Sequence, residues 1–337
     1  MQTVELVEVT RGERVESIHY GAVAVVDAKG NLVAHAGDPD RVTYLRSSAK
    51  PFQLLPLVES GGADHFRFTG QELAAMAASH SGEPRHVETV RGILGKIGLG
   101  EDALQCGAHW PASVESTRIL RESGREPGPI YNNCSGKHAS MLAQCVYRRL
   151  TTHDYLDPQH PVQVTLLNTL AEMSGLDVDA IGVGIDGCSA PCFAIPLRAC
   201  ALAFARLADP SALPEPRRSA IRRIVNAMMA YPEMVAGEAR LDTALMRAAH
   251  GRVASKGGAE GYQGIAVVSK GLGVAFKIVD GNGQRGGPPV AIDVLQQLNV
   301  LDDAALAELR EYRGGVQKNH RGLDVGEVRA VVKLTFT

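Results

Sequence analysis

The sequence predicts an α+β protein in which strands from the two ends of the chain form one antiparallel sheet flanked by helices. Segments typical of strands lie near both termini, whereas segments with apolar residues at helical spacing fill the middle. At 337 residues and 45% hydrophobic content, the chain can bury a large core. We expect one domain over residues 1–337, with a helical lobe at roughly 60–250 inserted between the strand segments.

The strands are predicted from alternation and from β-branched runs. Near the N-terminus they form a meander around a Lys29-Gly30-Asn31 turn, and near the C-terminus a hairpin surrounds Lys270-Gly271. Because no helix separates the early strands, antiparallel pairing is expected. The predicted strand segments are 4–9, 21–28, 32–36, 264–269, 274–279 and the alternating end 327–337.

The helices of the middle are predicted from period and capping. Thr69 to Glu72 fits a capping box ahead of the apolar run LAAMAA, and residues 86–99 carry apolar residues at helical spacing. The same pattern predicts helices at 113–123, 138–149, 161–174, 215–230 and 241–249.

Charge and composition exclude several classes of function. The 35 basic and 37 acidic residues give a net charge of -2 without blocks of like charge, so neither nucleic acid nor a membrane is an expected partner. No apolar run approaches the roughly 20 residues that span a bilayer, and the first residues lack a signal-peptide core, so a cytoplasmic location is expected. The six cysteines have no CxxC spacing, which indicates free thiols or metal thiolates.

The segment RSSAKP contains a serine-lysine pair. Ser47 and Lys50 are three residues apart, which places them on one face of a helix. A neutral lysine amine beside a serine hydroxyl can take its proton and so create a nucleophile. The motif is short, and an exposed serine and lysine on a helix surface is the alternative reading.

Two further segments place polar groups beside small residues. ASHSGE puts Ser79 and His80 at the end of an apolar helix, where a loop can present them to a cleft, although a simple helix end and turn fits equally. In KGGAEG, Lys256 precedes Gly257 and Gly258, glycines that let the backbone approach a ligand. A flexible hairpin loop is the alternative there.

Two segments, YNNCSGKH at 131–138 and DGCSAPC at 186–192, put cysteines among small residues. Two thiolates and a third ligand can hold zinc, and a lysine ligates only as the neutral amine. Buried apolar thiols are the alternative. His80, His109 and His138 are candidate ligands or acid-base groups, or structural histidines.

Taken in order, RSSAKP, ASHSGE, NNCSGKH, GIDGCSAP and SKGGAEG, with YPEMVAGEARLDT at 231–243, resemble the rhizobial-type bacterial asparaginases. The resemblance covers nearly the whole chain, and the series is far more specific than any one motif. That family is similar in fold to serine β-lactamases and penicillin-binding proteins. The resemblance therefore implies this fold, a homodimer, and hydrolysis of L-asparagine to L-aspartate and ammonia.

The resemblance also implies two serine-lysine tandems converging on one cleft, Ser47 with Lys50 and Ser79 with Lys256. Ser47 would attack the amide carbon and Lys50 would act as base and then as acid, with backbone amides as the oxyanion hole. Whether Ser79 relays protons or is itself the nucleophile stays open. The expected substrate-binding residues are Arg46, His80, Asp186 and Gly257.

A zinc site formed by Cys134, Lys137 and Cys188 is the remaining implication. Water would hold the fourth position, and the metal would help to bind the substrate carboxylate or amino group, because serine already supplies the nucleophile. Asp186 would bind the substrate amine or orient a metal ligand.

Three alternatives to an asparaginase follow from the same residues. A glutaminase differs by one methylene, worth only about 1–3 kcal/mol in a pocket. A penicillin-recognising acyl-serine enzyme would carry KTG where this chain has Lys256-Gly257-Gly258. In a non-catalytic protein that binds amino acids or zinc, the serines would only donate hydrogen bonds.

Overall fold

The computed structural model describes residues 2–337 and divides into two compact units, neither of them continuous in sequence. The first unit contains the chain up to Ser48, Ile195–Asp209 and Ala244–Thr337, and the second contains Ala49–Ala194 and Pro210–Thr243. The single domain with an inserted lobe at 60–250 stays a prediction. Within residues 2–337, no helix is both long enough and apolar enough to cross a membrane.

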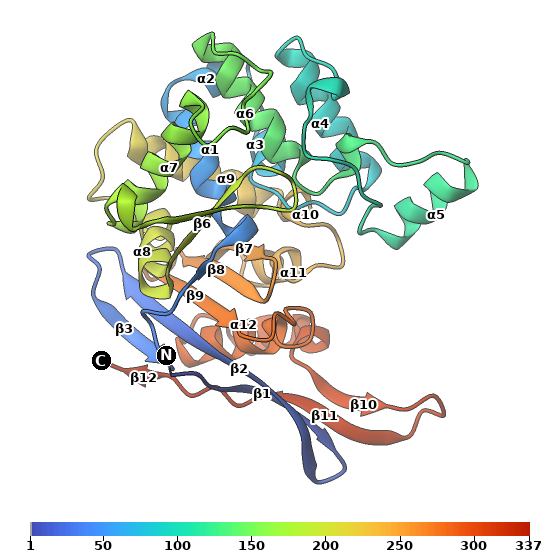
Figure 1. The fold of residues 1–337 in the computed structure, drawn as a ribbon. Helices are drawn as coiled ribbons and strands as arrows, with labels where there is room; N and C mark the ends of the chain where they lie inside the picture. The colour runs from blue at the N-terminus through green and yellow to red at the C-terminus, as the bar shows by residue number, and fades with distance from the viewer. Residues whose placement is uncertain (1) are drawn as a thin grey trace. The chain divides into compact units, whose positions relative to one another are not determined.

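The first unit is built on an antiparallel sheet to which both ends of the chain contribute (Figure 1). Within the described residues its main path runs β10-β11-β1-β2-β9-β8-β7, and β3 joins β2 to β12 at one side. The strands are β1 (Val4–Arg11), β2 (Arg14–Asp27), β3 (Leu32–Ala36), β7 (Val253–Gly258), β8 (Tyr262–Val267), β9 (Leu272–Ile278), β10 (Gly315–Lys318), β11 (Asp324–Ala330) and β12 (Thr335–Phe336).

The register ties the two ends of the chain together. In β1, Val7 is paired with His19 of β2 and with Ala330 of β11. Val23, in the fully buried part of β2, is paired with Phe276 of β9. The predicted α+β class, with an antiparallel sheet from both termini, is confirmed.

Helices cover this sheet. Helix α8 (Leu197–Ala208) packs against β2, β8 and β9, and α12 (Gly287–Gln297) contacts β1, β8 and β11. A Cβ atom on Gly273 would lie 1.9 Å from the carbonyl oxygen of Ala201, so glycine is what lets α8 approach β9 this closely. The unit also contains β4 (Val42–Tyr44), α13 (Asp303–Glu308) and the 3-10 turns η1 (Arg46–Ala49) and η5 (Arg310–Tyr312).

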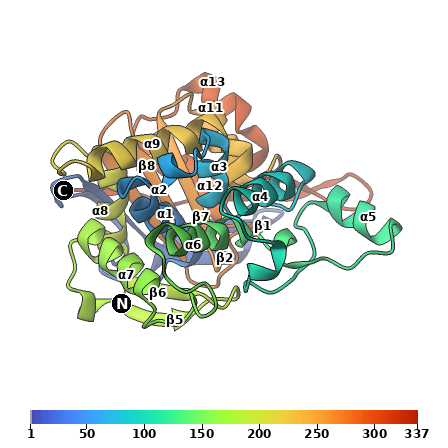
Figure 2. The same ribbon diagram turned by 90° about the horizontal axis from the view of Figure 1, so that it is seen from above.

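The second unit is mainly helical (Figure 2). Helix α1 is its centre, because it contacts α6, α7 and α9 and buries most of its residues from Lys50 to Val58. The helices are α1 (Lys50–Glu59), α2 (Gly62–His65), α3 (Gly70–Met76), α4 (Pro84–Lys96), α5 (Val114–Glu122), α6 (Ser135–Arg148), α7 (Pro161–Ser174), α9 (Arg217–Ala230) and α10 (Pro232–Val235). A hairpin, β5 (Gly182–Ile185) and β6 (Pro191–Pro196), completes it, and α11 (Leu241–Ala248) begins in it.

Helices α3 and α6 meet at an unusually close contact. The predicted capping box is confirmed, since Thr69 and Glu72 bond reciprocally at the start of α3. At the start of α6, a Cβ atom on Gly136 would lie 2.1 Å from the carbonyl oxygen of Ala75. Gly136 therefore lets the end of α3 lie close to the first turn of α6.

Candidate functional site

Lys50 is a deeply buried lysine of the second unit. It opens α1, where Pro51 occupies the first turn that tolerates proline, and only 1% of Lys50 is exposed. Its Nζ lies 2.5 Å from the carbonyl oxygen of Ala78, 2.9 Å from Ser79 Oγ and 3.3 Å from the carbonyl oxygen of Asn133. The lysine therefore joins the start of α1 to the loops after α3 and before α6.

Lys50 is also hydrogen-bonded to the side chain of Cys134. Its three oxygen partners suit a neutral amine as well as an ammonium ion. A neutral amine has two N–H donors and one lone pair, and two of the partners, Ala78 O and Asn133 O, only accept. The lone pair then faces the hydroxyl of Ser79, which can donate. Burial lowers the pKa of Lys50, and the nearby Lys137 charge lowers it further against the opposing effect of Cys134. The arrangement is that of a general base beside a serine.

Ser79 is fixed by its backbone. Its N–H donates to the carbonyl oxygen of Val235 at 2.8 Å, and two residues later Ser81 Oγ donates to the carbonyl oxygen of Ala236 at 2.7 Å. The loop after α3 is thus held against the segment that includes the end of α10. Because the N–H of Ser79 is already bonded, an oxyanion hole near Ser79 needs other donors.

The two ring nitrogens of His80 both have partners inside the protein. Ser135 Oγ donates to the carbonyl oxygen of Ile130 and so accepts from His80 Nε2 at 2.8 Å. The other nitrogen, Nδ1, accepts from the N–H of Gly82. Burial, followed by the neighbouring His86, holds the pKa of His80 well below its usual value. His80 is therefore a neutral link between the Ser79 loop and α6, and its predicted contact with substrate stays a prediction.

The three predicted metal ligands come together. Lys137 Nζ donates to Cys188 Sγ at 2.9 Å, and Cys134 and Cys188 are hydrogen-bonded to each other. All three are buried. Helix α6 supplies Lys137 and is preceded directly by Cys134, whereas Cys188 lies in the tight loop between β5 and β6. Residues 54 positions apart in the chain thus share one polar cluster.

The protonation of this cluster is uneven. The hydrogen bond from Cys188 lowers the pKa of Cys134 well below that of an ordinary thiol, whereas the same bond and burial raise the pKa of Cys188. Burial lowers the pKa of Lys137, but the charges of Cys134 and Cys188 have a larger opposite effect, so the pKa of Lys137 is raised. Within the cluster, the negative charge is therefore favoured on Cys134 over Cys188, beside the positive charge of Lys137.

A conventional metal cluster is not seen in the described part of the chain, residues 2–337, where no group of three or more His, Cys, Asp or Glu side chains could hold an ion. The proposed metal ligands are two cysteine sulfurs and one lysine amine. Lysine is not one of the four residue types in such a group, so this set falls outside it. Asp186 is half-exposed in the same β5–β6 loop, where its carboxylate accepts from the N–H of Gly187 at 2.7 Å.

The first unit holds the other predicted residues. Lys256 lies in β7 and is 1% exposed, and its Nζ donates to the carbonyl oxygen of Gly257 at 2.7 Å. Ser48 Oγ donates to the carbonyl oxygen of Lys256 at 2.7 Å and so fastens η1 to β7. Arg46 and Ser47 are half-exposed in η1. Lys256 is therefore part of a strand, and the alternative of a flexible hairpin loop is wrong for this residue.

The contact found within one unit is between members of the two predicted pairs. Ser47–Lys50 and Ser79–Lys256 each join residues of different units and stay predictions, as do the roles of all the candidate residues. Within the second unit, the hydroxyl beside Lys50 is that of Ser79. The structure thus combines one member of each predicted tandem.

Two contributors were not predicted. Asn133 acts through its carbonyl oxygen, and its N–H donates to His109 Nε2 at 3.0 Å. Ser48 acts through a buried bond to a strand. The doublets Asn132-Asn133 and Ser47-Ser48 were the available signals, but backbone acceptors have no side-chain signature.

Several solved structures with some similarity to the chain are distant from it in sequence. One is the protein named Mglu in its glutamate form (14% identity, TM-score 0.46). The match covers 83% of this chain and 61% of the Mglu chain. A Bacillus subtilis glutaminase in covalent complex with 5-oxo-L-norleucine (13% identity, TM-score 0.39) matches over 83% of this chain and 88% of its own. A β-lactamase from Mycobacterium bovis (14% identity, TM-score 0.40) matches over 87% and 95%.

Sequence comparison gives a more direct result. No curated protein matches the chain. The family profile described as L-asparaginase II matches residues 7–330, which include every candidate residue discussed above. The chain belongs to the L-asparaginase II family.

Proposed function

We propose that this protein is an amidohydrolase that converts L-asparagine and water to L-aspartate and ammonia. The observation that carries the proposal is the position of Lys50 Nζ, enclosed by two carbonyl oxygens and 2.9 Å from Ser79 Oγ. Membership of the L-asparaginase II family supports the choice of an amide substrate. A serine with a buried amine beside it suits acyl transfer.

In the proposed mechanism, neutral Lys50 takes the proton of Ser79 as Oγ attacks the side-chain amide carbon. The resulting ammonium then gives a proton to the departing nitrogen, so that ammonia leaves and an ester to Ser79 remains. Water attacks the ester, with Lys50 again as base, and releases aspartate. The two carbonyl oxygens of Ala78 and Asn133 hold the amine in place throughout. By resemblance to the family, Ser47 and Lys256 take part in the same reaction.

Zinc is the proposed cofactor, held by Cys134, Lys137 and Cys188. The donor set fits, because the lowered pKa of Cys134 favours the thiolate that binds metal and Lys137 already contacts Cys188 Sγ. Binding would displace the protons of Lys137 and Cys188. Once bound, zinc would act as a Lewis acid toward the substrate carboxylate or amino group. The residues themselves keep the β5–β6 loop against the start of α6.

The test of the proposed reaction is ammonia release from L-asparagine and L-glutamine in parallel. We expect the protein to hydrolyse both amides, with kcat/KM for asparagine about 10- to 200-fold higher than for glutamine. This is the range of discrimination that one methylene allows. Release from glutamine alone would assign a glutaminase. Binding of asparagine by calorimetry without any ammonia would contradict the enzyme and favour a binding protein, and turnover of nitrocefin would favour the penicillin-recognising alternative.

Zinc content is expected to depend on the three proposed ligands. Wild-type protein should hold about one zinc per chain by elemental mass spectrometry, and Cys134→Ser or Cys188→Ser should abolish it. The matched control is Cys145→Ser, because Cys145 is also a buried thiol of α6 but is not one of the three. Equal zinc in all four proteins would refute the site. Zinc should also raise the melting temperature of the wild type and of Cys145→Ser but not of the two ligand variants, since binding to the folded state stabilises it.

The homodimer and the cytoplasmic location stay predictions from the sequence and its resemblance. Light scattering in solution would measure the first of these directly.

A further inference from the structure

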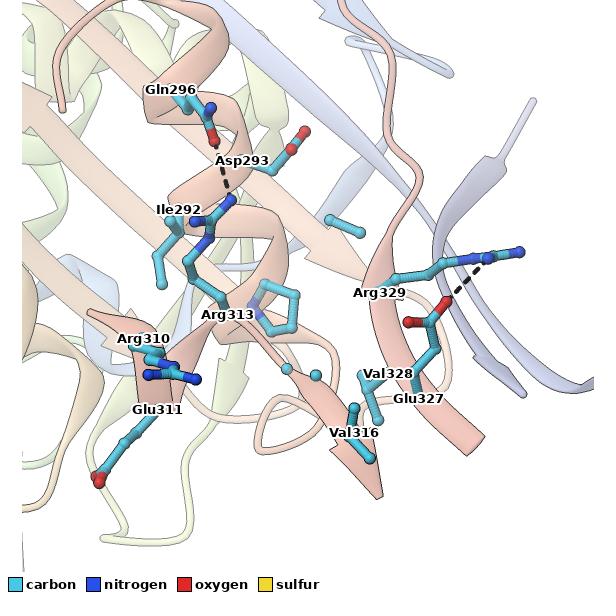
Figure 3. A pocket seen from close by; sticks show the side chains of 14 residues that line it. Ile292, Asp293, Gln296, Arg310, Glu311, Arg313, Val316, Glu327, Val328 and Arg329 are labelled. Carbon is cyan, nitrogen blue, oxygen red and sulfur yellow. Dashed lines mark hydrogen bonds and ion pairs between the residues drawn. The ribbon is translucent and has the colours of Figure 1, made fainter. Parts of the chain in front are cut away.

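A pocket of about 810 Å³ lies in the first unit, away in sequence from all the candidate catalytic and metal residues. It is bounded by α12, by η5 and the turn after it, and by β10 and β11 (Figure 3). Its volume falls in the range of small-molecule sites. All of its walls come from the last 49 residues of the chain, from Pro289 onward.

Arg313 is the cation that faces this pocket beside α12. Its Nη2 donates to Gln296 Oε1 at 3.4 Å, a long contact that Figure 3 marks with a dashed line. A guanidinium has five N–H donors, and among residues 2–337 this is the one side-chain hydrogen bond found for Arg313. The remaining donors can take both oxygens of a carboxylate.

The acid near Arg313 is Asp293, one turn earlier on α12 than Gln296. It is half-buried, and one of its oxygens accepts from Gln297 Nε2 at 2.6 Å. Burial raises the pKa of Asp293, while the bond from Gln297 and the charge of Arg313 lower it. A half-buried carboxylate within the field of a guanidinium thus lines the same wall.

The backbone adds a donor at the same point. Arg313 has φ -76° and ψ -1°, and Gly314 follows with φ 86°. A right-handed then left-handed succession can turn N–H groups toward an anion. The N–H of Arg313 already donates to the carbonyl oxygen of Arg310 at 3.4 Å, so the N–H of Gly314 is the one that this turn adds. Glycine is required at 314, because a Cβ atom there would lie 2.4 Å from the carbonyl oxygen of Val328, whereas Gly315 faces open space.

The charges on the walls balance. Arg310, Arg313 and Arg329 are matched in number by Asp293, Glu311 and Glu327. On the strand side, Arg329 is paired with Glu327 at 2.9 Å and with Glu8 at 2.7 Å, so this part of the wall is already neutralised. An anion without an ammonium group would therefore meet carboxylates, whereas a ligand that carries both a carboxylate and an ammonium group, such as an α-amino acid, matches the wall.

We propose that this pocket binds a free α-amino acid as a zwitterion, with its carboxylate on the guanidinium of Arg313 and its ammonium group on Asp293. The inference does not depend on the proposed activity. If that activity holds, the amino acids nearest at hand are the substrate and product, and the pocket is a second site for them.

The test counts bound L-aspartate by equilibrium dialysis of the full-length protein with radiolabelled ligand. We expect Arg313→Ala to remove one bound aspartate per chain and Asp293→Asn to weaken the same site at least about tenfold. The matched controls are Arg321→Ala and Asp303→Asn, exposed residues of the same segment outside the pocket, which should bind as the wild type does. Unchanged binding in both pocket variants would overturn the proposal.

Two further arms separate the ligand classes. Glycine should displace aspartate from the pocket, whereas acetate and phosphate at the same concentration should not; displacement by acetate and phosphate equally would reduce the site to one for simple anions and overturn the proposal. The wild-type count separates this inference from the proposed function. If the wild type binds two aspartates per chain and Arg313→Ala binds one, both the pocket and the catalytic site are supported. If the wild type binds one and Arg313→Ala binds none, the pocket is supported and aspartate binding at the catalytic site is contradicted.

Discussion

Ser79→Ala and Lys50→Met are each expected to lower kcat/KM for L-asparagine by about 10³-fold or more, the upper part of the range for loss of an acid-base group. The reason is the 2.9 Å contact between Lys50 Nζ and Ser79 Oγ, through which one residue activates the other. Because the two act as a unit, the double variant should lose about as much as the worse single variant. Steady-state ammonia release on all four proteins measures the coupling.

Ser47→Ala is the matched comparison, because Ser47 belongs to the same RSSAKP motif as Lys50. Rapid-quench mass spectrometry on the wild type should find the aspartyl adduct on the peptide that contains Ser79. An adduct on the Ser47 peptide, or losses in Ser79→Ala and Lys50→Met that simply multiply, would assign the nucleophile to Ser47 and leave Ser79 as a proton relay.

Gly136→Ala is expected to destabilise the protein by about 1–3 kcal/mol, the usual cost of overpacking a close contact. The new methyl group would lie 2.1 Å from the carbonyl oxygen of Ala75, so α3 and α6 must move apart. This movement would displace the loop of Ser79 from the turn that precedes α6, and activity should fall together with the midpoint of thermal unfolding.

Gly95→Ala provides the control, since Gly95 is also a helical glycine of the second unit but has open space around its added Cβ atom. There the substitution should stabilise by about 0.5–1 kcal/mol, because alanine is the better helix former. Equal midpoints for Gly136→Ala and Gly95→Ala in calorimetry would contradict the close contact of α3 and α6.

Helices and strands were predicted best where either helical spacing or strand alternation was the dominant pattern in the sequence. The helix expected at 161–174 coincides with α7 (Pro161–Ser174), and the strand expected at 32–36 coincides with β3. β7 was missed because Lys256 and its two glycines indicate a turn, yet the strand is specified by burial between neighbours, which is a tertiary property. α12 was missed because GPP resembles a loop, although proline is well tolerated in the first turn.

The candidate site was predictable as a set of residues but less so as a set of contacts. Cys134, Lys137 and Cys188 were named together through the resemblance, and they lie together. The contact of Lys50 with Ser79 depends on where the end of α3 meets the start of α1, 29 residues apart, and no local spacing records that. The carbonyl oxygens of Ala78 and Asn133 are invisible to a reading of side chains.

The pairing of β1 with β11 constrains how the protein is made. Glu8 and Arg329, joined across these strands, are 321 residues apart. At about 5–20 residues per second, β1 leaves the ribosome roughly 15–60 s before its partner exists. During that interval β1 presents a bare strand edge, the kind of surface that invites association between nascent chains. The helices of the second unit can form from local contacts in the meantime, so closure of the sheet comes last and is a natural point for chaperone protection.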